Sequence, residues 1–556
     1  MAGKIYTPVT LWEDFSPEGF FVEVIKTLIY SDYALEKVRI SRPSVSGGVS
    51  VYLEILRPTL DSDKRPLIFV CQSVGNKIPR EEMKKIYDLG YSVCAIDFAG
   101  EPIEDASAFE EREYTFYPPL LSYAEYKNAK ANLLAIGQTV KTSPYYEWIV
   151  SSKYALKYLR SVGYDDISVV SEKDSTIIGF TLASTEKLSC FISLFGTGWQ
   201  VPIGHKFSDD IRTDFTPEEF CILAGLEAQS YASSVACPTL MLVATNYEKC
   251  DFDRAYETFS RTSENIYSAI NYSISSRTLS NSSYNNFVTF LRAFAKKELI
   301  ILPSETFIES KIVDGKISVT VTADARALEK TVIYASEGEL DPKKRTYRHI
   351  ATFKAKEDGK FTLTYQPTKN KKLVCFFAKS YYENGFSVSS QVVCKRYTDK
   401  EVSGMPEYNV IFSAKDALHS RVFEEIAPSV STLFNMNEEP VTVKNLVVGA
   451  KNVKGLKVVG GIETNAVLSP ENGAILLLDV CSDGEREIVV ELVNNDNKSY
   501  RAITKIAGGN LWYNLKFEMP KFKTDELYQL KTYEDIRKIK IYSADGEFLI
   551  NNLMWI

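Results

Sequence analysis

Apolar and polar positions follow two rhythms over the first 300 residues. Residues 36–57 alternate with a period of two around Ser-Gly-Gly, which predicts a β-hairpin. Further on, continuously apolar segments are separated by amphipathic stretches with helical spacing. Buried strands that alternate with helices predict a doubly wound parallel sheet. The predicted strands are residues 66–71, 91–97, 166–170, 188–196 and 237–245, and the predicted helices are residues 81–90, 145–163 and 284–297.

After residue 300 the pattern changes to short strands with turn residues about every ten positions. This spacing predicts a β-sandwich of immunoglobulin size. Residues 395–409 are polar with Gly and Pro, which is typical of a linker, and residues 410–556 are strand-rich again, as in a second sandwich of the jelly-roll kind. We therefore predict three domains, at residues 1–300, 301–398 and 405–556.

Composition narrows the function. The net charge of -7 and the pI near 5.5 give no reason to expect a nucleic acid or an anionic membrane as partner. No apolar stretch is long enough to span a bilayer, and the first residues lack the pattern of a signal peptide, so we expect a cytoplasmic protein. The nine Cys are scattered singly, which favours buried reduced thiols and no metal. We expect no cofactor.

Residues 169–180, VVSEKDSTIIGF, predict a strand, a polar turn and a helix. The order of hairpin, strand–helix units, this elbow and two more strands resembles the α/β-hydrolase fold, and within it the dienelactone hydrolase and acetyl xylan esterase group. The stretches that carry the likeness include SVYLEILRP, RPLIFVCQSVGNK, LGYSVCAIDFAG and VACPTLMLVATNYEKCDFDRAYETF, within residues 35–298.

The resemblance assigns catalytic positions, and this chain lacks the expected residue at each. In the Gly-x-Ser-x-Gly elbow, Lys173 takes the place of the nucleophile, and Ser171 and Ser175 take the glycine places. Tyr247 stands where the acid is expected. The loop at residues 275–286, represented by Ser280, has no His, and His205 follows one strand too early. The oxyanion loop reads Gln72-Ser73 instead of His-Gly.

Two alternatives give the elbow a chemical role. Lys173, at a helix N-terminus, would act as a base or an amine nucleophile with Ser171 or Ser175. Asp174 would act as a carboxylate nucleophile in a shifted alignment. We favour an ion pair of Lys173 with a neighbouring carboxylate, and a Tyr247 ring that fills the volume of a lost His–Asp pair.

Asp251 and Asp253 occupy alternate positions after a predicted strand. They suggest a metal, but without further oxygen ligands at loop spacing we favour helix N-terminal carboxylates.

Residues 306–394 resemble the Ig-like domain that follows some bacterial hydrolase domains, on TVIYASEGELDPKKRTYRHIATF and FAKSYYENGFSVSSQVV. Residues 410–556 resemble a galactose-binding-type jelly roll of the carbohydrate-binding-module kind, on AILLLDVCSDGEREIVVELV and NLWYNLKFEMPKFK. Trp512, Tyr513 and Tyr500 are candidate sugar-stacking residues. The alternative that we favour for Trp512 is packing in the sandwich.

Nucleophile, acid and base are missing together, which argues against Ser-type hydrolysis. We therefore favour a pseudoenzyme with a role in binding or assembly, whose partner is a glycan or a protein. One alternative is a cytoplasmic carboxylic-ester hydrolase, acting on acyl or acetyl-sugar esters, with a rearranged site. The other is a carbohydrate-binding protein that acts through its C-terminal jelly roll.

Overall fold

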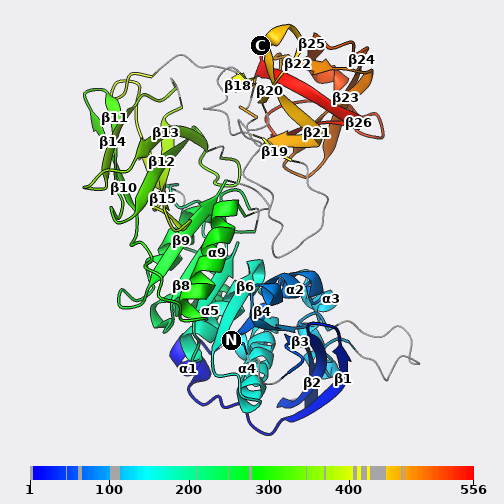
Figure 1. Ribbon diagram of the computed structural model, residues 1–556, viewed down its shortest axis with the longest axis vertical. Helices are drawn as coiled ribbons and strands as arrows, with labels where there is room; N and C mark the ends of the chain where they lie inside the picture. Colours follow the sequence, from blue (N-terminus) through cyan, green and yellow to red (C-terminus); the bar gives the residue numbers. More distant parts are fainter. Residues whose placement is uncertain are drawn as a thin grey trace.

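The computed structural model describes residues 4–44, 47–60, 65–100, 113–209, 211–247, 249–274, 279–345, 347–368, 371–404, 410–414, 423–425, 446–464, 467–468 and 470–556. An α/β region occupies one end of the molecule, a first β-unit lies against the β8–β9 side of its sheet, and a second β-unit lies at the other end (Figure 1). No helix in these ranges is both long enough and apolar enough to cross a bilayer.

Among the described residues of the α/β region, nine strands form one mixed sheet in the order β1-β2-β3-β5-β4-β6-β7-β8-β9. The sheet is parallel from β5 to β9, whereas β1, β2 and β3 are antiparallel to one another and β3 is antiparallel to β5. The strands are β1 (Phe21–Ile29), β2 (Ala34–Ser44), β3 (Gly47–Arg57), β4 (Leu67–Cys71), β5 (Ser92–Ile96), β6 (Ile167–Glu172), β7 (Phe191–Leu194), β8 (Thr239–Ala244) and β9 (Ser268–Ser273).

The predicted hairpin is β2–β3, and the five predicted buried strands are β4 to β8. The prediction missed β1 and β9, the two edges of the sheet. The side chains of β1 are mostly exposed, so no apolar run marks it. The buried face of β9 includes Asn271, which bonds the first β-unit. An edge strand that packs through polar groups gives no clear apolar signal.

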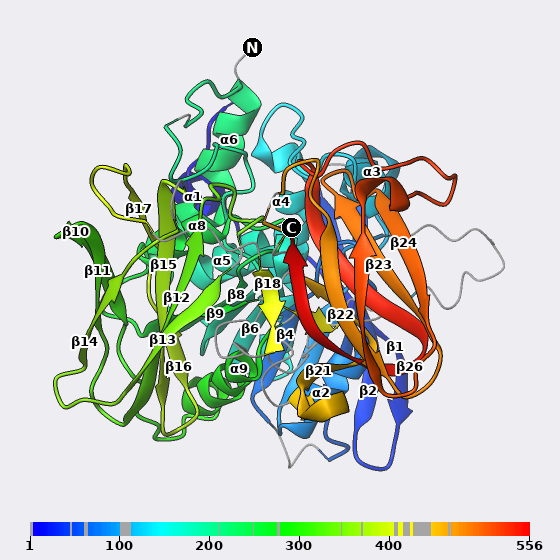
Figure 2. The ribbon, with the colours of Figure 1, turned by 90° about the horizontal axis from the view of Figure 1, so that it is seen from above.

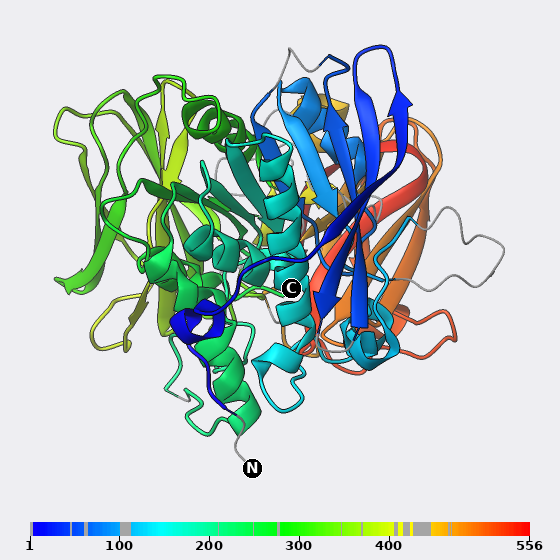
Figure 3. The same ribbon diagram turned by 90° about the horizontal axis from the view of Figure 1, so that it is seen from below.

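Helices cover both faces of this sheet (Figures 1 and 3). The period of two is visible in β4, where Leu67 and Phe69 join the core beneath α4, α5 and α8, and Ile68 and Val70 join the core beneath α2 and α9. The helices are α1 (Pro8–Trp12), α2 (Arg80–Asp88), α3 (Tyr126–Ala129), α4 (Pro144–Ser161), α5 (Thr176–Thr185), α6 (Pro217–Gly225), α7 (Ala228–Tyr231), α8 (Phe252–Phe259) and α9 (Asn281–Phe294).

The first β-unit stacks two antiparallel sheets, β10-β11-β14 and β13-β12-β15-β16, with β17 also paired to β15. Cys375 and Cys394 lie opposite each other on β15 and β17 and form a disulfide. The prediction of reduced thiols is therefore wrong for this pair, because strand register brought together two residues that the sequence shows only as scattered. The strands are β10 (Phe307–Val313), β11 (Lys316–Thr322), β12 (Leu328–Glu337), β13 (Arg348–Lys354), β14 (Lys360–Tyr365), β15 (Leu373–Tyr382), β16 (Ser387–Ser389) and β17 (Val393–Arg396).

The first β-unit shares its core with the α/β region. Along β12, Ile333 faces the inside of the sandwich, whereas Tyr334 faces the α/β region. Phe377 of β15 packs against Tyr272 of β9, with ring centroids 5.4 Å apart. Arg345 forms an ion pair with Asp253 of α8, and neither side chain has any exposed surface. The two parts are therefore joined by a buried interface rather than tethered by a linker.

The second β-unit has its own core. Its longest strand, β26, pairs with β18, β21, β22 and β23 and so joins the layers of the unit. Figure 2 shows β26 running the length of this unit. The boundaries at residues 300, 398 and 405 remain predictions. The strands are β18 (Val410–Ser413), β19 (Glu424–Glu425), β20 (Leu446–Val448), β21 (Lys454–Thr464), β22 (Leu476–Ser482), β23 (Arg486–Asn494), β24 (Ser499–Ile506), β25 (Leu511–Phe517) and β26 (Ile536–Trp555).

The buried ion pair yields a stability prediction. Arg345→Met should lower the free energy of unfolding by about 3–5 kcal/mol, because it leaves the Asp253 carboxylate buried without its partner. The matched control is Lys344→Met, which changes an exposed neighbour. Adding Asp253→Leu to Arg345→Met should recover much of the loss. Urea unfolding followed by tryptophan fluorescence measures all four proteins, and equal midpoints for Arg345→Met and Lys344→Met would contradict the prediction.

The α/β region and the first β-unit share their core, whereas the second β-unit has a core of its own. This difference predicts the products of limited proteolysis. The linker predicted at residues 395–409 was wrong at its start, because β17 extends to Arg396 and both Tyr397 and Val402 are buried in the core of the first β-unit. A protease should therefore cut within residues 403–409 and release a stable C-terminal fragment. Residues 301–394 should stay joined to the α/β region, because they share its core. Mass spectrometry of the fragments provides the test. A stable fragment that begins near residue 300 would show that the shared core contributes little.

Candidate functional site

The elbow predicted at residues 169–180 is a tight strand–turn–helix connection. Strand β6 ends at Glu172, a single 3-10 turn covers Lys173–Ser175, and α5 begins at Thr176. Lys173 has a φ of 54°, in the left-handed region that a side chain with a Cβ adopts at a cost. The strained position that a hydrolase elbow gives to its nucleophile is therefore present, and a lysine occupies it.

The two carboxylates that flank Lys173 occupy the donors of the oxyanion loop. The backbone amide of Ser73 donates to Oε2 of Glu172 (3.3 Å), and the backbone amide of Val74 donates to Oδ1 of Asp174 (3.2 Å). The Ser73 hydroxyl also donates to Oδ1 of Asp174 (2.8 Å). An oxyanion hole works by leaving such donors free for the substrate oxygen. Here side chains of the protein fill that role.

Lys173 forms an ion pair with Glu172, with Nζ 2.7 Å from Oε1. The Glu172 side chain is only 2% exposed, and that of Lys173 is 17% exposed. The cation thus compensates a buried carboxylate that is itself bonded to the oxyanion loop. Lys173, Glu172 and the amide of Ser73 form one chain of charge-assisted contacts.

The remaining predicted positions around the elbow are buried and structural. Gln72 donates from Nε2 to the carbonyl of Ile96 (2.6 Å) at the end of β5. The Ser175 hydroxyl accepts from the amide of Glu172 (2.9 Å) and lies 2.5 Å from the carbonyl of Cys71. Ser171 has no hydrogen-bond partner for Oγ among the described residues, and this atom packs against Gly179. Neither hydroxyl is thus presented to a substrate.

The acid position after β8 does not carry an acid. The ring of Tyr247 lies against Phe195, with centroids 5.5 Å apart. The residue before it, Asn246, donates from Nδ2 to the carbonyl oxygens of Lys343 (3.1 Å) and Arg345 (2.7 Å) in the first β-unit. This loop therefore holds the β-unit in place. Asn246 and Arg345 are 99 residues apart, and no local signal in the sequence reveals the contact.

Asp251 and Asp253 begin a helix, as the favoured interpretation predicted. Asp251 is the N-cap of α8, and its side chain accepts from the amide of Arg254. Asp253 lies in the first turn and is bound to Arg345. In the described part of the chain, no three His, Cys, Asp or Glu side chains are grouped as metal ligands would be.

The loop before α9 is also used for packing. Ser280 is the N-cap of α9, and its side chain accepts from the amide of Ser283. Lys379 of the first β-unit donates to Ser282 Oγ (2.7 Å) in the first turn of α9 and to Asn271 Oδ1 (3.0 Å) on β9. Residues 275–278 of the predicted His loop lie outside the described residues. His205 is exposed, and His349 bonds Thr352 on β13.

A buried glutamate, which the sequence did not single out, supports the elbow from the β7 side. Glu227 has no exposed surface, and it accepts a hydrogen bond from the amide of Val201 (2.7 Å). Gln200 of the same loop donates to the carbonyl of Asp174 (3.4 Å). Burial raises the pKa of Glu227 to about 7.

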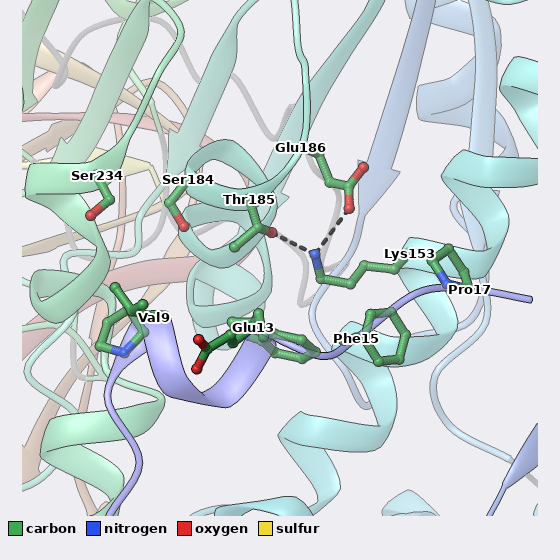
Figure 4. Close-up of a pocket in the computed structure, with 11 residues that line it drawn as sticks. Val9, Glu13, Phe15, Pro17, Lys153, Ser184, Thr185, Glu186 and Ser234 are labelled. Atoms are coloured by element: carbon green, nitrogen blue, oxygen red, sulfur yellow. Dashed lines mark hydrogen bonds and ion pairs between the residues drawn. The ribbon is translucent and has the colours of Figure 1, made fainter.

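A cavity of about 330 Å³ lies between the N-terminal segment and the end of α5 (Figure 4). Lys153 points towards Thr185 and Glu186 there and bonds both, at 2.6 and 2.9 Å. The elbow is at the opposite end of α5, a ten-residue helix about 15 Å long. This cavity is therefore not a substrate pocket for the elbow.

The three aromatic residues proposed for sugar stacking have different contacts. Trp512 is half-buried, donates from Nε1 to the carbonyl of Ala450 (3.0 Å) and packs over Gly455. The Tyr513 hydroxyl donates to the carbonyl of Gly508 (2.8 Å). Tyr500 lines a cavity of about 360 Å³.

Comparisons with known proteins give distant structural likeness only. No protein-family model and no curated protein matches the chain. An acetyl xylan esterase from Paenibacillus sp. R4 is 11% identical over 50% of this chain and 90% of its own, with a TM-score of 0.35. A glucuronoyl esterase from Solibacter usitatus is 11% identical over 53% and 88%, with a TM-score of 0.34. The resemblance to the α/β-hydrolase fold rests on the element order and the elbow, and these alignments add no argument to it.

The buried Glu227 predicts a pH dependence of stability. Its pKa is about 7 in the folded protein and near 4.5 when exposed, so the folded state retains a proton that the unfolded state loses. Below pH 4.5 the raised pKa of Glu227 makes its full contribution to the free energy of unfolding. This contribution is lost as the pH rises to 7, which lowers the free energy of unfolding by roughly 3 kcal/mol at most. The stability of Glu227→Gln relative to the native protein should therefore rise between these pH values. Urea unfolding at several pH values measures this, with the exposed Glu218→Gln as control. A difference that stays flat with pH would contradict the assignment.

Proposed function

We propose that this chain is a hydrolase-like protein that has lost catalysis at the elbow and works by binding or assembly. The observation that carries the proposal is the pair of hydrogen bonds from the Ser73 and Val74 amides to the carboxylates of Glu172 and Asp174. A substrate oxyanion would have to displace two anions that are covalently part of the turn. Such a site cannot stabilise the transition state of acyl transfer as an empty oxyanion hole does.

The surroundings support the same conclusion. A serine nucleophile needs a base within hydrogen-bond reach. At the start of α9, Ser280 caps the helix and Ser282, in its first turn, binds Lys379. The loop after β8 is bonded to the first β-unit through Asn246. Both loops that would carry the acid and the base therefore serve the interface between the units.

The esterase alternative requires a rearranged site at Lys173. A Ser–Lys dyad needs a hydroxyl that is free to attack, but the Ser175 hydroxyl lies within the turn and Ser171 packs against Gly179. Asp174 as a nucleophile would first have to leave the Ser73 hydroxyl. We therefore favour the binding role.

We further propose that the first β-unit is Ig-like and that the second is a jelly roll. One sheet of this unit contains β10, β11 and β14, and the other contains β12, β13 and β15. This division of the strands is typical of Ig-type sandwiches. Units of both kinds commonly present binding surfaces, which agrees with a binding role. A glycan or a protein is the proposed partner, and a cytoplasmic location remains part of the proposal.

The test is turnover of short acyl p-nitrophenyl esters by the purified full chain. The native protein should show no more turnover than Lys173→Ala, and fluorophosphonate probes should not label it, because the elbow holds no activated serine. Lys173→Ser should also remain inactive, since it restores the hydroxyl without a base.

A triple variant, Lys173→Ser with Tyr247→Asp and Asn281→His, provides the contrast. It is the smallest change that places a nucleophile, an acid and a base in the order of the fold, and it leaves the Ser280 cap intact. Turnover by the native protein that Lys173→Ala abolishes would overturn the proposal in favour of the esterase.

A further inference from the structure

The cavity that Tyr500 lines lies in the second β-unit, far from the elbow in the sequence. It is bounded by the turn between β23 and β24 and by residues 528–536, which lead into β26. Its volume of about 360 Å³ falls within the range of small-molecule sites, roughly 300–1,000 Å³. A ligand of one or two rings is therefore the size that it takes.

A lysine ammonium lies between two tyrosine rings in this cavity. Nζ of Lys498 is 5.8 Å from the ring centroid of Tyr500 and 5.4 Å from that of Tyr528. Within the described ranges, this ammonium has no hydrogen bond and no ion pair. Two other lysines of the unit differ from it, because Lys538 forms an ion pair with Glu463 and Lys540 with Glu491. The charge of Lys498 is thus available to an anionic group of a ligand.

The backbone that carries Tyr528 is held in place, and its ring is exposed. The amide of Thr524 donates to the carbonyl of Tyr528 (2.9 Å), and the amide of Tyr528 donates to Thr524 Oγ1 (3.2 Å). Arg501 of β24 and Lys523 exchange two backbone hydrogen bonds, of 2.7 and 3.0 Å, which fasten this loop to the sheet. Tyr528 is 65% exposed. An exposed ring on a fixed backbone suits stacking with a flat ligand.

The rest of the lining is polar. Asn494, Gln529, Thr532 and Asp535 contribute amide, hydroxyl and carboxylate groups. The ring of an aromatic acid offers these groups no hydrogen-bond partner. A sugar ring has hydroxyls for them and a C–H face for Tyr528. The lysines Lys498 and Lys531 outnumber the single lining carboxylate, in a protein whose net charge is -7.

We propose that this cavity binds a pyranose ring that carries a carboxylate, that is, a uronate residue of an acidic glycan. The carboxylate pairs with Lys498, the ring stacks on Tyr528, and the hydroxyls bond the polar lining. This site is independent of the elbow, so its failure and the failure of the proposed loss of catalysis are separate results.

Isothermal titration calorimetry with the full chain tests the proposal. The acidic probes are the trisaccharides of galacturonate and glucuronate, the neutral probes are the corresponding galactose and glucose trisaccharides, and benzoate and inorganic phosphate report anion binding alone. We expect an acidic trisaccharide to bind about tenfold or more tightly than its neutral counterpart, and binding to weaken with added salt.

Two variants and two matched controls assign the site. Lys498→Gln should remove the preference for the acidic sugar and leave neutral binding unchanged, whereas Lys505→Gln, an exposed change on the neighbouring strand β24, should alter neither. Tyr528→Ala should weaken binding of every sugar, and its exposed neighbour Leu527→Ala should not. All four side chains are exposed, so melting temperatures should stay within a degree or two of the native value.

The proposal is overturned if no acidic trisaccharide binds, if neutral and acidic sugars bind equally, or if benzoate or phosphate binds as tightly as the uronate. It is also overturned if Lys498→Gln retains the acidic preference, because the lysine would then not be the carboxylate partner.

Discussion

The structure depends on an ion pair that no water reaches. Arg345 of the first β-unit and Asp253 of α8 are both fully buried. Two charges out of water are tolerated only when each has its partner. Arg345 also donates to the carbonyl oxygens of Glu339 (3.0 Å) and Leu340 (2.6 Å), whereas Oδ2 of Asp253 has no hydrogen-bond partner among the described residues. The Asp253 carboxylate therefore depends on Arg345, and the α/β region and the β-unit must stay together.

The joining of the α/β region to the β-unit involves the two loops that the resemblance assigns to the catalytic acid and base. In the fold that the sequence resembles, the loops after β8 and before α9 carry catalytic side chains. Here Asn246 after β8 and Ser282 in the first turn of α9 bond the β-unit, through Arg345 and Lys379. Side chains that fix an interface cannot also approach a substrate at the elbow. The loss of catalysis that we propose and the rigid joining of the two parts thus involve the same segments of the chain.

The elbow has a strained strand–turn–helix geometry with a lysine at its centre. Lys173 retains a left-handed backbone conformation, which costs on the order of 1–3 kcal/mol for a residue with a Cβ. Glu172 and Asp174 satisfy the amides of the neighbouring loop, and Lys173 neutralises Glu172. Anions are favourable near a helix N-terminus, and the turn supplies them itself. The strained turn thus persists as a closed network of charges and hydrogen bonds.

The sequence by itself determined the buried strands β4 to β8, the helices between them and the elbow with Lys173 at its centre. Continuous apolar runs and local turn chemistry carry those features, and both are visible within a few residues. Only the tertiary structure decided that Glu172 and Asp174 occupy the oxyanion donors, that Cys375 pairs with Cys394, and that β1 and β9 extend the sheet. The hydrogen bonds and the disulfide join residues from 19 to about 100 positions apart in the chain. The two edge strands have little apolar pattern of their own. Strand register and burial create them, and neither is encoded in a local pattern of residues.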